Sequence, residues 1–329
     1  MKPYYKNEFS TLYNGDSLEI LKTLKDKSIN LIHIDPPYNI HIAEWDKWES
    51  IEKYVEFMGN IFQELDRVLK DNGTMYFWHM DMKQIPHLLL YLEKETNFNL
   101  NNQIIWNKGD WRALSWLNPT QDNNLRSWFT TTEYCYMFTK QDSTGLEQIT
   151  EEHIKPKNPF AKYLREEFDN ANITRKEIAK LFPSKTGGLT GCVSNWLNGD
   201  NIITLEQYNI IKEYVNYVYF NKEYEELRQE YEELRYTFNL EPLMNNVWKS
   251  NIRNDGSNHI CEKPLDLIEK IIRVSSNKGD IILDCFNGSG TTGIVANQLK
   301  RKYIGIELLE ENCEITKNRL QSLQMRLDI

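Results

Sequence analysis

The chain has 329 residues, of which 40% are hydrophobic and 26% are charged, and its formal net charge is −9. This length and balance predict a globular protein with a large core, either one large domain or a domain with a substantial insertion. No apolar stretch reaches the length of a membrane span, and Met1–Lys6 lacks the apolar core of a signal peptide. The negative charge argues against a nucleic-acid partner, because phosphate contacts need lysine and arginine.

Five cysteines are scattered along the chain without a CxxC pair, at positions 135, 192, 261, 285 and 313. This usage predicts no disulfide framework and fits a reducing cytoplasm. No cluster of residues with metal-ligand spacing is visible in the sequence, so we expect no metal site.

The N-terminal part of the chain alternates between expected strands and helices. Apolar runs bounded by turn residues predict the strands, and apolar residues at helical spacing predict the helices. The expected order is a strand at 11–14, a helix at 17–25, a strand at 29–34, a helix at 51–69, a strand at 74–78, a helix at 82–94 and a strand at 103–106. This rhythm predicts a mostly parallel α/β sheet with crossover connections.

The middle of the chain departs from this rhythm. Residues 107–132 are too long for a plain connection and are interpreted as a functional loop before a strand at 132–139. From about 141 to 242 the composition changes, which predicts a helical insertion between two halves, 1–140 and 243–329, of one α/β domain. Near its end, 223–228 is repeated seven residues later, and the charge of this segment predicts a solvated or packing helix.

Two short helices of the insertion are predicted by their ends. Thr174 is the expected N-cap of the first helix, with Glu177 three residues later. A glycine-bearing turn at 185–188 leads to the second helix, Thr190–Asn198, and the pair resembles a helix-turn-helix. The DNA contacts expected from it are Lys185, Thr190, Ser194 and Asn195. Many helical hairpins of this kind bind nothing, and that alternative stays open.

The last part of the chain returns to an α/β pattern. We expect a helix at 264–275, a strand at 280–284, a helix after the glycines, a strand at 303–307 and a charged helix from 311. Gly288–Gly293 matches GxGxxG between a strand and a helix, and Glu307 follows Gly288 by nineteen residues. Such glycines let a ligand approach backbone N–H groups, and the acid can take ribose hydroxyls. The pattern predicts a nucleoside-type cofactor; a glycine turn needed only for packing is the alternative.

The choice of cofactor depends on the residues just before the glycines. NAD, FAD and S-adenosylmethionine are all bound at turns of this kind. Asp284 and Phe286 favour S-adenosylmethionine, because a carboxylate can meet a cationic amino-acid moiety but would repel a pyrophosphate.

The expected strand at 29–34 ends abruptly at Asp35-Pro36-Pro37-Tyr38. Two prolines fix φ twice and remove two N–H donors, so this corner presents only acceptors beside an aromatic ring. Acceptors and a stacking surface suit a planar substrate with N–H donors, such as the exocyclic amine of a base. A Pro-Pro turn over a packed tyrosine is the alternative interpretation.

The two motifs together, DPPY at 35–38 and DCFNGSG at 284–290, closely resemble those of the DNA amino-methyltransferases, which methylate adenine N6 or cytosine N4. That family has a catalytic motif of the form (D/N/S)PP(Y/F/W) and a cofactor motif FxGxG, and their order here is that of its β group. Gly15-Asp16, the strand at 132–139 and His259–Pro264 also resemble family motifs, although Ile260 replaces the usual proline. The resemblance covers roughly 8–140 and 243–320. It implies a Rossmann-like methyltransferase fold with a circularly permuted sheet.

The resemblance also implies roles for individual residues. The catalytic residues would be Asp35, Pro36, Pro37 and Tyr38. Asp284, Phe286, Gly288 and Gly290 would cradle the methionine end of S-adenosylmethionine, and Ser289 and Thr291 would be further cofactor-binding residues. Glu307 would take the ribose, Asp16 would lie near the adenine, and Lys263 would lie near the cofactor carboxylate.

The chemistry expected of the corner follows from its residue types. A base inside a duplex must be flipped into a pocket, at a cost of a few kcal/mol, before its amine can react. Tyr38 offers a ring for stacking, and the Asp35 carboxylate and Pro36 carbonyl can accept both amine hydrogens. Asp35 with Tyr38 favours adenine N6 over cytosine N4. No cysteine lies beside a proline, as cytosine-C5 chemistry would need.

Two other classes of protein are weaker alternatives. An NAD-dependent oxidoreductase would rest on GxGxxG alone and would leave the DPPY corner and the motif order unexplained. A non-catalytic DNA-binding regulator would rest on the helix-turn-helix and would leave the intact catalytic motif unexplained.

The expected partner is double-stranded DNA, and the resemblance is compatible with a homodimer. A negative chain can bind DNA only through a local basic face, so we expect one beside the cleft, with acid concentrated on the helix at 223–233. The expected cations of that face are Lys108, Arg112, Arg126, Lys185, Lys249 and Arg253.

Overall fold

A computed structural model describes residues 2–109, 130–140, 158–184, 187–215, 219–233, 237–239, 245–250 and 263–327. The chain divides into two compact units, one formed by Met1–Gly145 with Thr237–Ile329 and the other by Leu146–Tyr236. The second unit lies within the 141–242 segment that composition marks as an insertion. Within the described ranges, no helix is both long and apolar enough to span a membrane.

One sheet organises the first unit. Its described strands are β1 (Tyr5–Lys6), β2 (Ser10–Asn14), β3 (Ile29–Ile34), β4 (Leu69–His79), β5 (Asn99–Asn107), β6 (Thr132–Thr139), β7 (Val247–Lys249), β8 (Ile281–Asp284) and β9 (Lys302–Glu307). They lie side by side in the order β1-β2-β9-β8-β3-β4-β6-β5-β7. The pairs β1–β2, β4–β6 and β5–β6 are antiparallel and the others are parallel. The predicted mostly parallel, Rossmann-like α/β architecture is confirmed.

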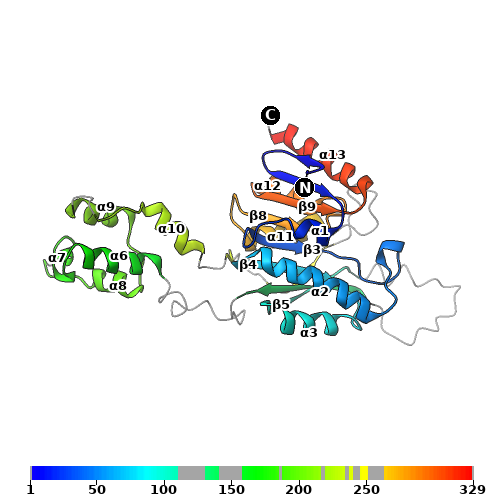
Figure 1. Cartoon of the computed structure of the whole chain (residues 1–329), viewed down its shortest axis with the longest axis horizontal. Coiled ribbons are helices and arrows are strands. Elements are labelled where there is room, and N and C mark those ends of the chain that lie inside the picture. The colour runs from blue at the N-terminus through cyan, green and yellow to red at the C-terminus, as the bar shows by residue number, and fades with distance from the viewer. Residues whose placement is uncertain are drawn as a thin grey trace. The chain divides into compact units, whose positions relative to one another are not determined.

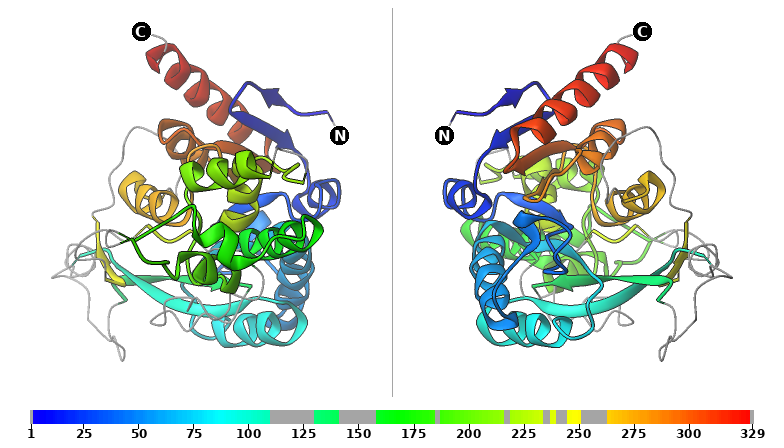
Figure 2. Two further views of the ribbon diagram at one scale, coloured as in Figure 1. Left: turned by 90° about the vertical axis from the view of Figure 1, so that its left-hand side faces the viewer. Right: turned by 90° about the vertical axis from the view of Figure 1, so that its right-hand side faces the viewer.

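Helices cover both faces of this sheet (Figures 1 and 2). The described helices of this unit are α1 (Ser17–Leu21), α2 (Ile51–Val68), α3 (Ile85–Glu95), α11 (Leu265–Ser275), α12 (Thr291–Gln298) and α13 (Glu310–Leu327), and a short 3-10 helix, η1 (Glu44–Asp46), lies in a loop. Side chains alternate along β4, so Met75 and Phe77 join the hydrophobic cluster of α1, α2 and α3. Tyr76 and Trp78 join the opposite cluster, with α11 and α12. The sheet is therefore the middle of three layers.

Strands β3 and β8 are direct neighbours in the centre of the sheet. They run parallel, with Leu31 opposite Ile282 and Ile32 opposite Leu283. Parallel neighbours present their carboxyl ends at one edge of a sheet, which is where ligands bind in open α/β folds. The segments that follow the two strands, 35–38 and 285–290, therefore meet at that edge.

The start of β4 differs from the position predicted from turn-forming residues. The sequence at 70–73, Lys-Asp-Asn-Gly, predicts a turn, but β4 already begins at Leu69. Leu69 pairs with Ile29, and an irregularity separates this pair from the regular register that begins at Leu31 and Thr74. Pairing with β3 thus outweighs the local turn preference. The short strands β1 and β7 were not predicted.

The second unit is a helical body with its own core (Figure 1). Its helices are α6 (Pro159–Asn170), α7 (Arg175–Ala179), α8 (Cys192–Asn198), α9 (Leu205–Tyr214) and α10 (Tyr224–Glu233). Thr174 and Glu177 form the predicted capping box of α7, and Thr204 and Gln207 form a second one at α9. The core includes several aromatic side chains, among them Phe160, Phe168, Trp196, Tyr208 and Phe220. Helices α6 and α9 were not predicted.

Candidate active site

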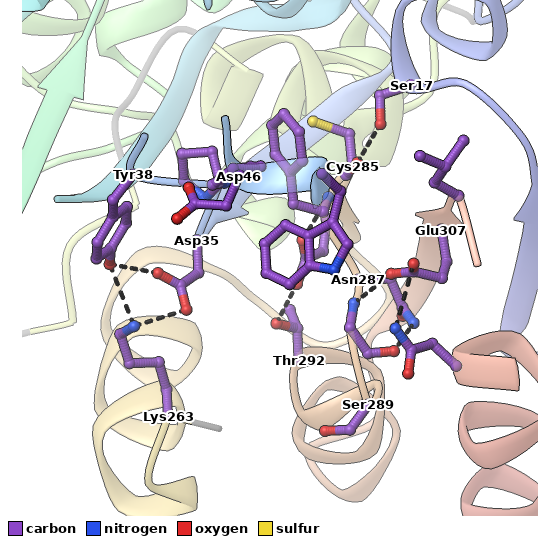
Figure 3. Close-up of a pocket in the computed structure, with 18 of the residues that line it drawn as sticks. Ser17, Asp35, Tyr38, Asp46, Lys263, Cys285, Asn287, Ser289, Thr292 and Glu307 are labelled. Atoms are coloured by element: carbon purple, nitrogen blue, oxygen red, sulfur yellow. Dashed lines mark hydrogen bonds and ion pairs between the residues drawn. The ribbon is translucent and has the colours of Figure 1, made fainter. Parts of the chain in front are cut away.

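A cavity of about 550 Å³ opens at the edge where β3 and β8 end (Figure 3). Its lining includes every predicted catalytic residue and nearly every predicted cofactor residue: Asp16, Asp35, Pro36, Pro37, Tyr38, Lys263, Asp284, Phe286, Gly288, Ser289, Thr291 and Glu307. Residues from the two ends of the chain thus share one cavity. Gly290 is not part of the lining.

The carboxylate of Asp35 already has a partner on each oxygen. Tyr38 donates its hydroxyl to Oδ1 at 2.5 Å, and Lys263 Nζ lies 2.6 Å from Oδ2. Figure 3 shows both side chains converging on Asp35. Burial raises the pKa of Tyr38 well above its ordinary value, so its hydroxyl keeps its proton and acts as a donor. No donor among the described residues occupies the Pro36 carbonyl.

A buried carboxylate that was not predicted, Glu133 of β6, completes this group. Its Oε1 lies 2.7 Å from both Lys263 Nζ and the Tyr38 hydroxyl, and its Oε2 pairs with Lys108. Two carboxylates and two ammonium groups therefore form one network. Burial alone would raise the pKa of Glu133, but the two lysines outweigh burial and lower it. Burial alone would lower the pKa of Lys263, but Asp35 and Glu133 raise it.

The contacts of Lys108 and Lys263 in this network differ from those expected from the sequence. Lys108 does not belong to an exposed basic face, because it is only 6% exposed and is paired with Glu133. Lys263 was expected near the cofactor carboxylate, but its partners in the structure are Asp35 and Glu133. The signal for Glu133 in the sequence is a single acid at the start of an otherwise apolar, aromatic strand.

A second chain of hydrogen bonds holds the backbone of the Asp35–Tyr38 corner. Tyr54 of α2 donates its hydroxyl to the Pro37 carbonyl at 2.6 Å, and His79 Nε2 lies 3.1 Å from that hydroxyl. The other ring nitrogen of His79 accepts the Asp81 N–H, which assigns the proton of the neutral ring to Nε2. Burial lowers the pKa of His79 to about 4, so the ring is neutral at pH 7.

The loop after the corner is organised around the fully buried Asp46. Its carboxylate accepts the backbone N–H groups of Asn39 at 2.6 Å, Ile40 at 3.1 Å and Ile42 at 3.2 Å. Asn39 and His41 have φ of 53° and 63°, a left-handed conformation that non-glycine residues rarely adopt. The loop presents three exposed apolar side chains at the cavity, Ile40, Ile42 and Trp45. Strained backbone of this kind is common at ligand sites.

On the cofactor side, Asp284 is oriented by a buried relay. Its Oδ1 accepts the Phe286 N–H at 3.0 Å, and its Oδ2 accepts the Thr292 hydroxyl at 2.6 Å. His33 Nδ1 lies 3.0 Å from that hydroxyl oxygen, and Trp78 Nε1 donates to His33 Nε2 at 2.9 Å. The Trp78 bond assigns the His33 proton to Nδ1. The relay ties β3, two residues before Asp35, to the carboxylate that ends β8.

The glycine turn and the acid of the next strand are joined directly. Gly288, at φ 52°, donates its N–H to Glu307 Oε2 at 2.7 Å. The other oxygen of Glu307 accepts the Leu309 N–H at 2.9 Å. Burial raises the pKa of Glu307 above its ordinary value, although these hydrogen bonds oppose the shift. The carboxylate expected to take a ribose is thus held at the cavity wall.

Two of the three motif glycines are needed for packing. A Cβ on Gly290 would lie 2.5 Å from the side chain of Thr316, and a Cβ on Gly293 would lie 2.5 Å from the ring of Tyr303. Packing is therefore a sufficient reason for glycine at these two positions, whereas Gly288 lines the cavity. Arg319 of α13, which was not predicted, supports the turn by donating to the Ser289 carbonyl and hydroxyl, both at 2.9 Å.

Asp16 caps a helix and also lines the cavity. It is the N-cap of α1, where Oδ1 accepts the Glu19 N–H at 3.0 Å, and it also lines the cavity. The neighbouring Ser17 donates its hydroxyl to the Cys285 carbonyl at 2.5 Å, which ties the start of α1 to the end of β8.

The expected DNA contacts are distributed over both units. Ser194 and Asn195 are exposed on α8, and Lys249 is exposed on β7. The hydroxyl of Thr190 donates to the Phe182 carbonyl at 3.0 Å, so it serves the turn before α8. The remaining expected contacts lie outside the described residues, namely Arg112, Arg126, Lys185 and Arg253. The family motif at 259–262 lies outside them too.

Comparison with solved structures shows that DNA methyltransferases share this fold. The chain matches the PvuII DNA methyltransferase (cytosine-N4-specific) with a TM-score of 0.58 and 17% identity, over 97% of this chain and 88% of that one. It matches M1.HpyAVI in complex with SAM with a TM-score of 0.51 and 19% identity, over 94% and 98% of the two chains.

Sequence comparison gives the family. The profile described as DNA methylase matches residues 29–318, and the chain belongs to this N6/N4 family of S-adenosylmethionine-dependent DNA amino-methyltransferases. The type II methyltransferase M2.LlaDCHI of Lactococcus lactis subsp. cremoris is 25% identical over 334 residues, covering 97% of this chain and 92% of the relative. The DNA adenine methyltransferase YhdJ of Escherichia coli (strain K12) is 27% identical over 326 residues, covering 96% and 84%. The oxidoreductase alternative is therefore wrong.

The residues of the cavity suit the cofactor of this family. Asp284 accepts two hydrogen bonds from the protein, and a carboxylate has about four acceptor positions, so it can accept more. Its negative charge, buried beside a glycine turn, suits the cationic amino-acid part of S-adenosylmethionine and would repel a pyrophosphate.

Proposed function

We propose that this protein transfers a methyl group from S-adenosylmethionine to N6 of an adenine that is flipped out of double-stranded DNA. The observation that carries the proposal is the juxtaposition of Asp35 and Asp284 at the ends of the neighbouring strands β3 and β8, in one cavity. One segment offers acceptors for an amine and the other an anion for a cationic cofactor. The preference for adenine rests on the pairing of Asp35 with Tyr38 and is supported by the relative named as an adenine methyltransferase.

The cofactor-binding residues follow from the same geometry. Asp284 is proposed to meet the amino group of the methionine part, and Glu307 the ribose hydroxyls. Asp16, at the start of α1, is proposed to lie near the adenine of the cofactor. When bound, S-adenosylmethionine supplies an electrophilic methyl group. Residues 286–289 line this side of the cavity. Gly288 has no side chain, so a ligand can approach the backbone there.

Asp35 is proposed to receive the amine of the target base. Its carboxylate and the Pro36 carbonyl each accept one amine hydrogen, which directs the nitrogen lone pair towards the methyl donor. When nitrogen gains the methyl group it must lose one proton, and Asp35 is placed to accept it. Lys263 orients Asp35 until then, because the ammonium lies 2.6 Å from Oδ2.

Tyr38 is proposed to stack against the flipped base. Flipping costs a few kcal/mol, and stacking on an aromatic ring recovers part of that cost. The hydroxyl of Tyr38 is tied to Asp35 and Glu133, so the ring is already fixed at the cavity wall. A preorganised ring loses little freedom when the base arrives.

The test is transfer of an isotope-labelled methyl group to DNA, followed by digestion to nucleosides and mass spectrometry. Labelled N6-methyladenine is the expected product. Labelled N4-methylcytosine would instead show that the target base is cytosine. Asp35→Ala is the matched variant: it should bind the cofactor in calorimetry but transfer no label. An Asp35→Ala enzyme that is as active as the wild type would overturn the assigned role of Asp35.

A further inference from the structure

Helix α8 of the second unit has one buried and one polar face. Val193, Trp196 and Leu197 are buried in the core of the unit. Ser194, Asn195 and Asn198 are exposed, and their spacing places them on one side of the helix. None of these three side chains is hydrogen-bonded to another described residue. Asparagine amides offer a donor and an acceptor side by side, the pattern that pairs with the edge of adenine in the major groove.

The helix is mounted rigidly on the element that precedes it. The rings of Phe182 and Trp196 pack edge to face with their centroids 5.2 Å apart, and Thr190 donates to the Phe182 carbonyl. Pro183 and Leu189, both between α7 and α8, form a β-bridge. This connection is longer than the three or four residues of an ordinary helix-turn-helix. The two helices are nevertheless fixed to each other.

Charge is segregated within the unit. Residues 174–198 carry four basic side chains and one acidic side chain, Glu177, which is used in the capping box. Residues 205–233 carry eight acidic and three basic side chains. Figures 1 and 2 show α9 and α10 on one side of the unit and α7 and α8 on the other. Arg175, Lys176 and Lys180 are all exposed at α7, the helix that precedes α8.

We propose that α8 enters the major groove of duplex DNA and reads base edges with Ser194, Asn195 and Asn198, while Arg175, Lys176 and Lys180 contact phosphates. Cations and neutral hydrogen-bonding side chains suit a polyanion with a patterned groove, and the acidic helices α9 and α10 lie on the other side of the unit (Figure 1). The inference rests on the proposed action on DNA and deepens it, because it assigns the choice of target sequence to this unit.

The base-reading arm of the test compares the intact wild-type enzyme with the Asn195→Ala/Asn198→Ala variant. Long-read sequencing of DNA from a host that expresses each protein gives the modified sequence context. The variant should modify a broader set of sequences, because each lost bidentate contact relaxes discrimination roughly 10-fold or more. Asn209→Ala, which removes an exposed amide from α9, is the control and should keep the wild-type context. An unchanged context in the double variant would overturn the proposal.

The phosphate arm measures binding and does not depend on methyl transfer. Arg175→Ala/Lys176→Ala/Lys180→Ala should bind every duplex more weakly in fluorescence anisotropy, with a shallower dependence of affinity on salt. Lys162→Ala, an exposed cation of α6, is the control and should leave both unchanged. Equal affinity and salt slope in the triple variant and the wild type would overturn the proposal. If the wild type binds DNA through α7 but transfers no methyl group, the proposed reaction fails and the docking surface stands.

A second substitution guards against misfolding. Asn195→Asp keeps the size of the side chain and places a negative charge at the groove, so duplex binding should fall while the melting temperature stays that of the wild type. A lower melting temperature together with unchanged DNA binding would show that Asn195 serves the fold, and would overturn its role in reading bases.

Discussion

Lys263 Nζ lies 2.6 Å from Asp35 Oδ2, although 228 residues separate the two in the chain. The carboxylate proposed to be catalytic is therefore oriented by the half of the domain that carries the glycine motif. Because Lys263 also contacts Glu133 at 2.7 Å, the ammonium balances two carboxylates at once. Removal of this one cation should disturb the corner more than any surface substitution.

Lys263→Met is expected to lower the rate of methyl transfer at least 100-fold and to destabilise the fold. Breaking one side of a buried ion network costs about 3–5 kcal/mol, because the remaining charges lose their partner. The measurements are labelled methyl transfer under saturating cofactor and urea unfolding. Lys263→Arg, which keeps the charge, is the control and should recover part of both. A methionine variant with wild-type turnover would show that Asp35 needs no cation beside it.

Whether Lys263 acts on the corner or on the cofactor can be separated by kinetics. A role through Asp35 predicts a fall in kcat with little change in the cofactor Kd. A role at the cofactor carboxylate predicts the reverse, namely a higher Kd with kcat largely kept. Calorimetry of cofactor binding to the Lys263→Met variant decides between the two.

His79 should make the stability of the protein depend on pH. Burial lowers its pKa to about 4, below the ordinary value of 6.5, so below pH 6.5 the unfolded chain binds a proton that the folded one does not. Its contribution to the unfolding free energy is therefore lost as pH falls from 6.5 to 4, by up to about 3 kcal/mol. Urea unfolding between pH 4 and 7 measures this slope.

Two glutamine variants, one test and one control, check the role of His79. His79→Gln should flatten the slope, whereas His87→Gln, at an exposed histidine of α3, should leave it unchanged. Equal slopes in the wild type and His79→Gln would show that His79 carries no part of the acid sensitivity.

Thr292→Val is expected to weaken cofactor binding while sparing the fold of the corner. The substitution keeps the shape of the side chain but removes the hydroxyl that donates to Asp284 Oδ2 at 2.6 Å. A hydrogen bond to a charged group contributes about 1.5–3 kcal/mol, so the cofactor Kd should rise about 10- to 100-fold. Isothermal titration calorimetry measures it. Thr292→Ser keeps the hydroxyl and should bind the cofactor nearly as well as the wild type. Similar cofactor affinities in the serine and valine variants would show that this hydrogen bond does not contribute to cofactor binding.

Gly290→Ala should destabilise the protein through its neighbour on α13. The added Cβ would lie 2.5 Å from the Thr316 side chain, and φ at Gly290 is 82°. The left-handed conformation costs an alanine roughly 1–2 kcal/mol, and the steric clash adds to this. A double-mutant cycle with Thr316→Ala, followed by thermal unfolding, should recover the clash but not the backbone cost. Additive effects of the two substitutions would mean that the clash is relieved by other movements.

The sequence was sufficient to predict the elements that carry the site, and the reason is local. Asp35–Tyr38 and Gly288–Gly293 lie where strands end, and strand ends are marked by turn chemistry within a few residues. Parallel strands then bring their carboxyl ends to one edge, which places Asp35 and Asp284 together. This much follows from periodicity and topology.

The surroundings of the site could not be predicted because they depend on contacts between distant segments. Glu133 lies on an antiparallel strand, and no local pattern couples it to Lys108 and Lys263. His79 and Tyr54 meet under Pro37 only after α2 packs on the sheet. The expected exposure of Lys108 was wrong for the same reason: a lysine in a loop sequence is normally solvated, but here β6 provides a buried partner.

The neighbouring positions of β3 and β8 have a consequence for gene architecture. The sheet requires only that these two strands lie side by side, not that one be translated before the other. The N-terminal segment packs on α13, where Tyr4 donates to Glu314 and Asn7 to Gln324. A coding sequence cut within the second unit and rejoined by a short linker between these segments would still specify the same edge of the sheet. The chemistry of the site therefore does not depend on the order of the two motifs in the chain.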